Sequence, residues 1–136
     1  MAFFKKKPKL IDDIPLGVAW VTNNFNATGY RADGTIESLK EVDRFIDDEH
    51  KPGGVLDGKM GAVVFGLGCY IGQVIIDTFG GQWVTNDNDP MGEVNIAVNL
   101  SDGSTIWPVQ RVIKRIKEGP ENAIYPYAVA MGRRTE

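Results

Sequence analysis

A long apolar run at residues 60–79 constrains the fold of this chain more than any other feature. Apolar side chains cover most of the circumference of a helix built from this run, and a helix of that kind is buried. Gly61, Gly68 and Gly72 fall on one of its faces, although each glycine costs about 1 kcal/mol relative to alanine in a helix interior. We therefore expect another backbone to pack closely there, and the glycine pair at 80–81 to end the helix.

The same run approaches the length of a membrane span. Residues 60–76 carry no charge, which is near the lower limit for a spanning helix, and Gly68 and Gly72 have the spacing of packed membrane helices. Four features argue against a membrane span: the polar Gln73, the many glycines, the lack of an adjacent basic flank and the charge of Asp77. We therefore expect a buried soluble helix and no membrane span.

Size and composition predict one domain. A chain of 136 residues can bury enough surface to fold without disulfides or a metal. Cys69, the single cysteine, lies inside the apolar run and is expected to be a small core residue. The formal net charge of −3 argues against nucleic acid as a partner. We expect no cofactor, and a cytoplasmic location because the N-terminus lacks the apolar stretch of a signal peptide.

Local patterns around the apolar run predict an α+β fold with a long buried central helix, a small mainly antiparallel sheet and flanking helices. Residues 1–14, with a basic run at 5–9, are expected to be a loosely ordered arm, 15–132 a single α+β domain, and 133–136 a polar tail. Three further helices are expected: one at 36–48 behind an N-cap at Thr35, one from Pro108 to a stop at Gly119, and one from Pro120 to Met131. Strands are expected at 18–22, 82–85 and 93–100, and an irregular segment at 23–34.

The segment 101–103 predicts a hairpin turn with two possible registers. A two-residue loop would pair Asn99 with Ile106 and place Ile106 on the polar face of the sheet. A three-residue loop with Gly103 in the left-handed conformation would pair Val98 with Ile106 instead. We expect the second arrangement, because register follows the hydrophobic face.

Polar and aromatic residues supply two candidate sites. Tyr70, Gln73 and Asp77 line one stripe of the apolar helix, which faces either water or the floor of a pocket. With Trp83 and Arg111 as neighbours, this stripe would bind a small ligand or carry an enzymatic pocket. Recognition surfaces are enriched in aromatic residues and arginine. The candidate partner-binding residues are Trp83, Trp107, Arg111 and Tyr125.

Other patterns carry less information. His50 follows three acidic residues, but a lone histidine predicts no zinc site, and the acidic loop at 86–92 lacks the ligands of a calcium loop. No nucleophile elbow, P-loop or dinucleotide fingerprint occurs, so no residue is assigned as catalytic. The basic helix after Pro108 could hold phosphates beside Trp107, Tyr125 and Tyr127, although a solvated basic face is the simpler expectation.

Four short motifs follow one another along the chain. They are Leu67-Gly68-x-Tyr70-x-Gly72-x-x-Ile75, Gly80-Gly81-x-Trp83, Asp102-Gly103, and Pro108-x-x-x-Val112-x-Lys114-Arg115-x-x-x-Gly119. Across residues 35–127 the chain thereby resembles a family of small uncharacterised bacterial domains of unknown function, which implies the same order of elements and no catalytic role. Small acidic cytosolic proteins of this kind also resemble immunity proteins of bacterial toxin systems, although no residue here is diagnostic of one.

The sequence favours non-enzymatic protein–protein recognition in a bacterial cytoplasmic protein. The partner is another protein, with an immunity-like role or a homo-oligomer left open. The alternative is a small-ligand-binding or enzymatic pocket around Tyr70, Gln73, Asp77, Trp83 and Arg111. Exposed apolar side chains in a cluster would favour recognition, and a deep pocket with convergent polar groups would favour the alternative.

Overall fold

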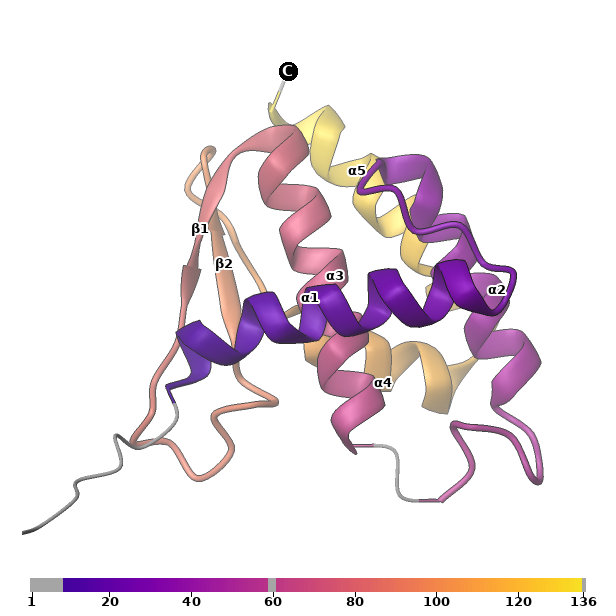
Figure 1. Ribbon diagram of the computed structural model, residues 1–136. Helices are drawn as coiled ribbons and strands as arrows, with labels where there is room; N and C mark the ends of the chain where they lie inside the picture. Colours follow the sequence, from indigo (N-terminus) through magenta and orange to yellow (C-terminus); the bar gives the residue numbers. More distant parts are fainter. Residues whose placement is uncertain (1–8, 59–60, 136) are drawn as a thin grey trace, which may run out of the picture.

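Helix α3 (Gly61–Phe79) runs through the middle of the fold, as the sequence predicts (Figure 1). The computed structural model describes residues 9–58 and 61–135, with side chains as far as Gly132, so the predicted helix start at Met60 lies outside the described residues. The other elements, in chain order, are α1 (Leu10–Ala27), η1 (Ile36–Ser38), α2 (Leu39–Glu49), β1 (Gly81–Val84), β2 (Ala97–Leu100), β3 (Thr105–Ile106), α4 (Pro108–Glu118), η2 (Pro120–Asn122) and α5 (Ile124–Thr135).

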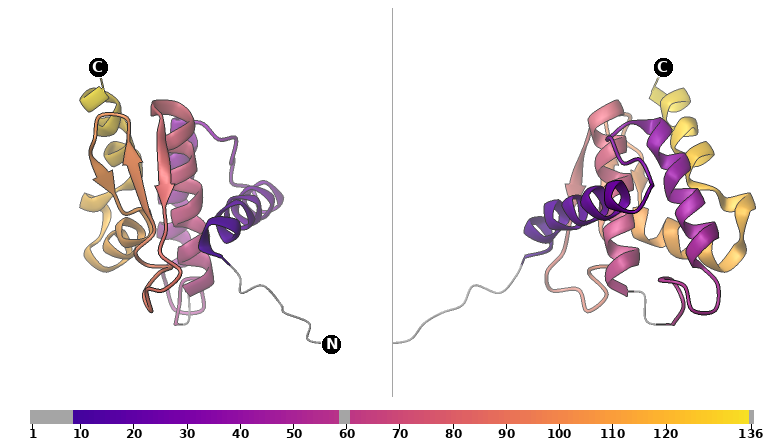
Figure 2. Two further views of the ribbon diagram at one scale, coloured as in Figure 1. Left: turned by 90° about the vertical axis from the view of Figure 1, so that its left-hand side faces the viewer. Right: turned by 45° about the vertical axis from the view of Figure 1, so that its right-hand side comes forward.

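Helices and a small sheet pack around α3 from several sides. Helix α1 lies crosswise over one side of α3, whereas α4 and α5 lie on the opposite side (Figure 2). The three strands, in the order β1-β2-β3, stand along a third side. Leu67, Ile71 and Ile75 of α3 are fully buried in the resulting core. The predicted α+β class, with a long buried helix and an antiparallel sheet, is confirmed.

Glycines let the neighbouring elements approach the backbone of α3. A Cβ atom on Gly68 would lie 2.9 Å from both Cα and N of Val109, at the start of α4. A Cβ atom on Gly72 would lie 2.7 Å from Cζ2 of Trp83. The predicted close approach of another backbone is found at Gly68, whereas the close neighbour of Gly72 is the side chain of Trp83. At Gly61 a Cβ atom would meet no atom of the described residues within 4 Å.

A further small-residue contact joins α1 to α3. A Cβ atom on Gly17 would lie 3.1 Å from the Cβ atom of Cys69, and one on Gly66 would lie 3.4 Å from Trp20. Two helices can cross this closely only where side chains are small, because larger ones would hold the backbones apart.

The hairpin has the predicted register. Strand β2 pairs antiparallel with β3, with Val98 opposite Ile106. The backbone N–H of Leu100 donates to the carbonyl of Ser104 at 2.8 Å, which closes a three-residue loop, and Gly103 has a φ of 90°. The buried face of β2 has set the register, as expected for a sheet with one face against the core.

The N-terminal expectations are wrong within the described residues. Residues 10–14 begin helix α1 rather than continuing a loose arm, and the predicted strand at 18–22 lies in the same helix. Residues 23–27, predicted to be irregular, complete it. The inner side of α1 carries Ile14, Val21 and Phe25 at helical spacing, and their burial against the core stabilises the helix. Residues 1–8 lie outside the described part of the chain.

Other boundaries differ from the sequence analysis. The predicted helix from Pro120 to Met131 is broken at Ala123, whose ψ of 145° separates η2 from α5. The predicted strand at 93–100 is strand only from Ala97, because the preceding residues form turns in which Asn95 N–H donates to the carbonyl of Met91 at 3.0 Å. Within the predicted polar tail, the backbone stays helical through Thr135.

A buried ion pair joins three helices. Arg115 of α4 is only 3% exposed, and its Nε donates to Asp43 of α2 at 3.1 Å while its Nη2 donates to Asp47 at 2.6 Å. The carboxylate of Asp43 also accepts the backbone N–H groups of Ile124 at 2.8 Å and Tyr125 at 3.0 Å, which are among the free donors at the start of α5. One carboxylate thus neutralises a buried cation and caps a helix.

Substitution of Gly68 by alanine tests the close contact between α3 and α4. We expect Gly68→Ala to lower the free energy of unfolding by about 1–3 kcal/mol, because the backbone of Val109 has to move to admit the methyl group. Urea denaturation followed by circular dichroism measures the change. Gly61→Ala is the matched control, because its Cβ would meet no atom of residues 9–58 and 61–135 within 4 Å, so stability should hold or rise. Equal effects of the two substitutions would refute the close contact.

The buried ion pair predicts unequal contributions from its two carboxylates. Asp43→Ala should lower the free energy of unfolding by about 3–5 kcal/mol, because Arg115 stays buried without its inner partner. Asp47→Ala should cost less than about 1 kcal/mol, because the side chain of Asp47 is 58% exposed and water can replace it. Thermal and chemical denaturation of both variants would measure the two changes in the free energy of unfolding. A larger loss of stability for Asp47→Ala than for Asp43→Ala would contradict the assignment of Asp43 as the inner partner of Arg115.

Candidate functional site

A groove runs along the solvent side of α4 and reaches α5. Its volume is about 560 Å³, and it is open to solvent along its length. The residues that line it, called here the α4 groove, are Trp107, Gln110, Arg111, Ile113, Lys114, Lys117, Glu118 and Tyr127.

The sequence of α4 separates a buried side from this groove. Pro108 starts the helix at its first turn, where a missing N–H costs no hydrogen bond. Val109, Val112 and Ile116 are buried against the core. The opposite side of the helix carries Gln110, Lys114 and Lys117 into solvent, whereas Arg115 is buried.

Arg111 is the centre of the α4 groove. Its guanidinium carbon lies 4.3 Å from the centroid of the Tyr127 ring, a cation–π geometry that holds the planar group in place. Its Nε atom is buried and has no hydrogen-bond partner among the described residues. No carboxylate of the described residues pairs with Arg111, in contrast to Arg115 on the same helix. Trp107 lines the same groove and is 46% exposed.

A second hollow, of about 300 Å³, lies between α1 and α3. We call it the α1–α3 cleft. Its lining residues are Val18, Thr22, Ala32, Asp33, Gly34, Tyr70, Gln73, Val74 and Asp77. Three of the predicted ligand-binding residues, Tyr70, Gln73 and Asp77, are therefore brought to one cleft.

The polar groups of the cleft are hydrogen-bonded within the protein. Tyr70 is 2% exposed, and its hydroxyl lies 2.6 Å from Oγ of Ser38 and accepts the N–H of Gly34 at 3.1 Å. Gln73 donates from Nε2 to Asp77 at 2.8 Å. The Nε1 group of Trp83 donates to Oε1 of Gln73 at 3.0 Å. These side chains mainly anchor a loop and a strand to α3.

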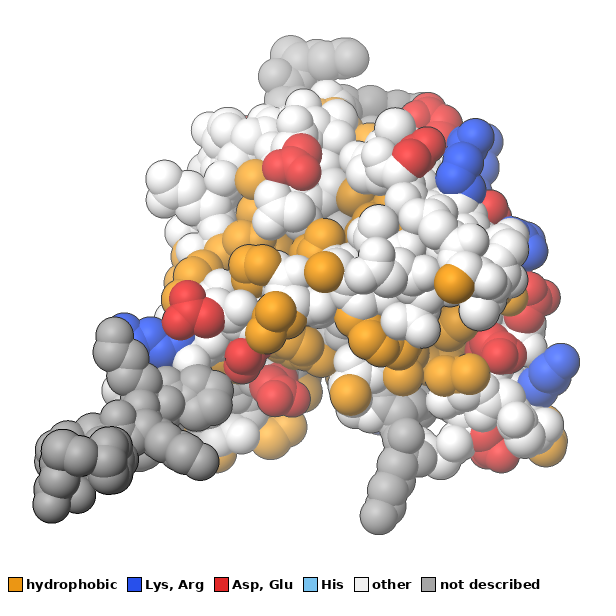
Figure 3. All heavy atoms as spheres, in the orientation of Figure 1, with side chains coloured by type: hydrophobic (Ala, Val, Ile, Leu, Met, Phe, Trp, Pro, Cys, Tyr) orange, Lys and Arg blue, Asp and Glu red, His pale blue; other side chains and the backbone are white. Residues whose placement is uncertain are grey.

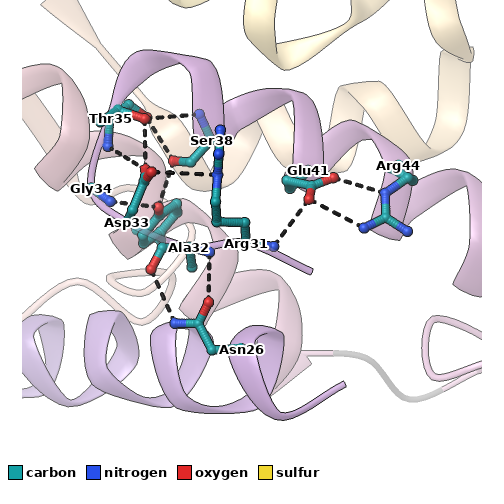
Figure 4. A network of polar contacts seen from close by, with 10 residues as sticks. Asn26, Arg31, Ala32, Asp33, Gly34, Thr35, Ser38, Glu41 and Arg44 are labelled. Carbon is teal, nitrogen blue, oxygen red and sulfur yellow. Dashed lines mark hydrogen bonds and ion pairs between the residues drawn. The ribbon is translucent and has the colours of Figure 1, made fainter. Parts of the chain in front are cut away.

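The loop at the mouth of the cleft is held by its own network (Figure 4). Asn26 exchanges two hydrogen bonds with the backbone of Ala32, at 3.0 and 3.1 Å. Asp33 accepts the hydroxyl of Thr35 at 2.6 Å, a hydrogen bond that lowers the pKa of this carboxyl below its ordinary value. Thr35 in turn accepts the N–H of Ser38 at 3.2 Å, which confirms the predicted N-cap.

The structure does not bring all residues of either predicted site together. Arg111 lines the α4 groove and not the α1–α3 cleft, and Trp83 joins the cleft residues only through Gln73. Of the predicted partner-binding residues, Trp107 and Arg111 share the α4 groove. Tyr125 lies in another surface hollow, where Nζ of Lys40 is 4.7 Å from its ring centroid.

Of the sequence patterns considered, the basic helix with neighbouring aromatic residues came nearest to predicting the α4 groove. Lys114 and Lys117 do line the groove with Arg111, and Trp107 and Tyr127, but not Tyr125, are the aromatic residues that line it with them. Glu118 adds one carboxylate to the rim. The fold therefore gathers a cationic and aromatic surface that the local pattern only partly indicates.

The face drawn in Figure 3 carries hydrophobic side chains scattered among polar ones. Leu16 and Trp20 of α1 are exposed, as are Val84 of β1 and Met91. Leu16 and Trp20 share α1, whereas Val84 and Met91 lie elsewhere in the chain. None of the four lines the α4 groove with its cations, so the α4 groove is the stronger candidate site.

Acidic residues near His50 have structural partners. Asp47 pairs with Arg115, and Asp48 accepts the hydroxyl of Tyr30 at 2.6 Å. Within residues 9–58 and 61–135, no group of three or more His, Cys, Asp or Glu side chains comes together in an arrangement that could hold a metal ion.

Among the described helices, α3 is long and apolar enough to cross a membrane. More than half of its apolar window is buried between the other elements, as in the core helix of a soluble protein.

Comparison of the chain with protein-family models, with curated proteins and with solved structures found no match. The family resemblance described above stays a prediction, and the functional argument rests on the geometry of this chain.

The environment of Cys69 predicts an unreactive thiol. Burial raises the pKa of this thiol to about 12, so almost none of the nucleophilic thiolate forms near neutral pH. We expect the native protein to leave a chromogenic disulfide reagent unreacted at pH 8, and the same protein in guanidinium chloride to react fully. Rapid reaction of the folded protein would contradict the buried position of Cys69.

Proposed function

We propose that this protein recognises another protein through the α4 groove, without catalysis. The observation that carries the proposal is that an exposed Trp107 lines the same groove as an Arg111 guanidinium held on the Tyr127 ring. Trp, Tyr and Arg dominate the residues that contribute most to binding at protein interfaces. A groove with all three types at its centre is therefore suited to hold a partner.

The geometry of Arg111 favours binding over a purely structural role. The Tyr127 ring already restricts the guanidinium, so less side-chain freedom is lost when a partner binds. The charge of Arg111 is not used by any described carboxylate, whereas the charge of Arg115 is fully used inside the fold. Lys114 and Lys117 extend the cationic surface along the same helix.

The alternative function, a small-ligand-binding or enzymatic pocket, belongs to the α1–α3 cleft. It is kept because Tyr70, Gln73 and Asp77 line that cleft together. It is the weaker candidate, because Tyr70 is already hydrogen-bonded to Ser38 and Gly34, and Gln73 to Asp77 and Trp83. Its volume of about 300 Å³ is also at the lower end of ligand pockets.

The bacterial origin, the cytoplasmic location and the immunity-like form of recognition belong to the same proposal. They rest on the sequence motifs and on the acidic balance of the chain. A homo-oligomer would be another form of recognition through the same groove.

Capture from a native lysate tests the proposed surface. Immobilised Trp107→Ala protein should lose the partner that wild-type protein retains, because truncation of a central interface tryptophan typically costs about 2 kcal/mol or more. Quantitative mass spectrometry of both eluates measures the loss. Val84→Ala removes an equally exposed apolar side chain from β1 and serves as the control, since capture should be unchanged.

Circular dichroism should show that Trp107→Ala is folded. If Trp107→Ala and Val84→Ala retain the same proteins in the same amounts, the α4 groove is not the recognition surface. Unfolding of Trp107→Ala would likewise count against an exposed binding role, and Arg111→Gln then provides the second variant for the same capture.

A further inference from the structure

We infer that the α4 groove binds an acidic segment of the partner, laid in extended form along α4. This inference rests on the proposed function and adds the chemistry of the partner. It follows from the sign of the charges in the groove, from their spacing and from the way the aromatic rings are used.

The groove has a charge opposite to that of the whole chain. The protein has a formal net charge of −3. Within the groove, three cations, Arg111, Lys114 and Lys117, face one carboxylate, Glu118. A cationic groove attracts a negatively charged segment and disfavours a positively charged one.

The cations are spaced for an extended segment. They follow one another every third residue of α4, so successive cations are about 4.5 Å apart along the helix axis, and the first and last about 9 Å apart. In an extended chain, side chains on one face repeat about every 6.6 Å. Two acidic side chains separated by one residue can therefore reach Arg111 and one of the two lysines at once.

Arg111 is the expected anchor for a carboxylate. Guanidinium groups bind carboxylates through two parallel hydrogen bonds, which a lysine cannot reproduce. The ring of Tyr127 supports the guanidinium from one side, with the guanidinium carbon 4.3 Å from its centroid. An apolar side chain next to the acidic pair would contact the exposed indole of Trp107.

Nucleic acid fits the same groove less well. Single strands bind through several aromatic rings on which successive bases stack. In this groove the face of Tyr127 is already covered by Arg111, which leaves Trp107 as the aromatic residue available for stacking. Three cations would also neutralise only a short stretch of phosphates. The geometry therefore points to carboxylates on a polypeptide.

A peptide titration of the 136-residue chain tests the inference directly. The probe is a nine-residue peptide in which Glu-Ala-Glu is flanked by leucines, and the comparison is its Gln-Ala-Gln counterpart. In nuclear magnetic resonance titrations, the acidic peptide should shift the backbone amide signals of α4. The Gln-containing peptide should bind at least tenfold more weakly, and 0.5 M salt should weaken the acidic peptide about tenfold, because exposed charges are screened.

Charge reversal supplies matched variants. Lys114→Glu combined with Lys117→Glu should abolish peptide binding, and Arg111→Lys should weaken it at least fivefold because the paired hydrogen bonds are lost. Lys40→Glu combined with Lys51→Glu makes the same change in net charge outside the groove and should leave binding intact.

Several results would overturn the inference. These are equal binding of the two peptides, no shift with the acidic peptide at millimolar concentration, shifts that lie outside α4 and α5, or tighter binding of a thymidine 12-mer or of phosphatidylserine vesicles than of the acidic peptide. The lysate capture separates this inference from the proposed function. If Trp107→Ala loses the partner while the Lys114→Glu and Lys117→Glu variant keeps it, recognition through the groove stands and the acidic partner is wrong.

Discussion

The close approach of other elements to α3 is the constraint on which the rest of the structure depends. At Gly66 the helix meets α1, and at Gly68 it meets the first residues of α4 almost at backbone contact. Side chains at these positions would hold both helices away from α3 and open gaps that the remaining core residues are too few to fill. The fold can therefore place its longest apolar helix in the centre of a chain of only 136 residues.

A buried helix leaves little surface for binding, and its polar residues are used inside the fold. Tyr70 holds the loop before η1, and Gln73 connects Asp77 to Trp83 of the sheet. The same residue types would indicate a ligand site if their hydrogen bonds were free. On α4 the opposite holds, because the charge of Arg111 has no carboxylate partner among the described residues. Unused polar groups, rather than polar groups as such, mark the surface available to a partner.

Local sequence patterns predicted much of the secondary structure correctly. They failed where contacts between residues far apart in the sequence determine the structure. The cap at Thr35, the start at Pro108 and the turn at 101–103 each depend on a few neighbouring residues, and each is found as predicted. Helix α1 was missed because Pro15 and the asparagines at 23–26 have weak helix propensity, and contacts with α3 outweigh that preference.

The candidate site was predictable only in part, for a related reason. Trp107 precedes α4 and its carbonyl accepts the N–H of Arg111 one turn later, so their closeness along the chain follows from the sequence. Tyr127 comes from α5, and nothing local indicates that its ring supports Arg111.

The double use of Asp43, which binds Arg115 and caps α5, has a consequence for the evolution of the chain. Neither residue can change alone without leaving a buried charge or an open helix end, so related sequences should exchange Asp43 and Arg115 together or retain both.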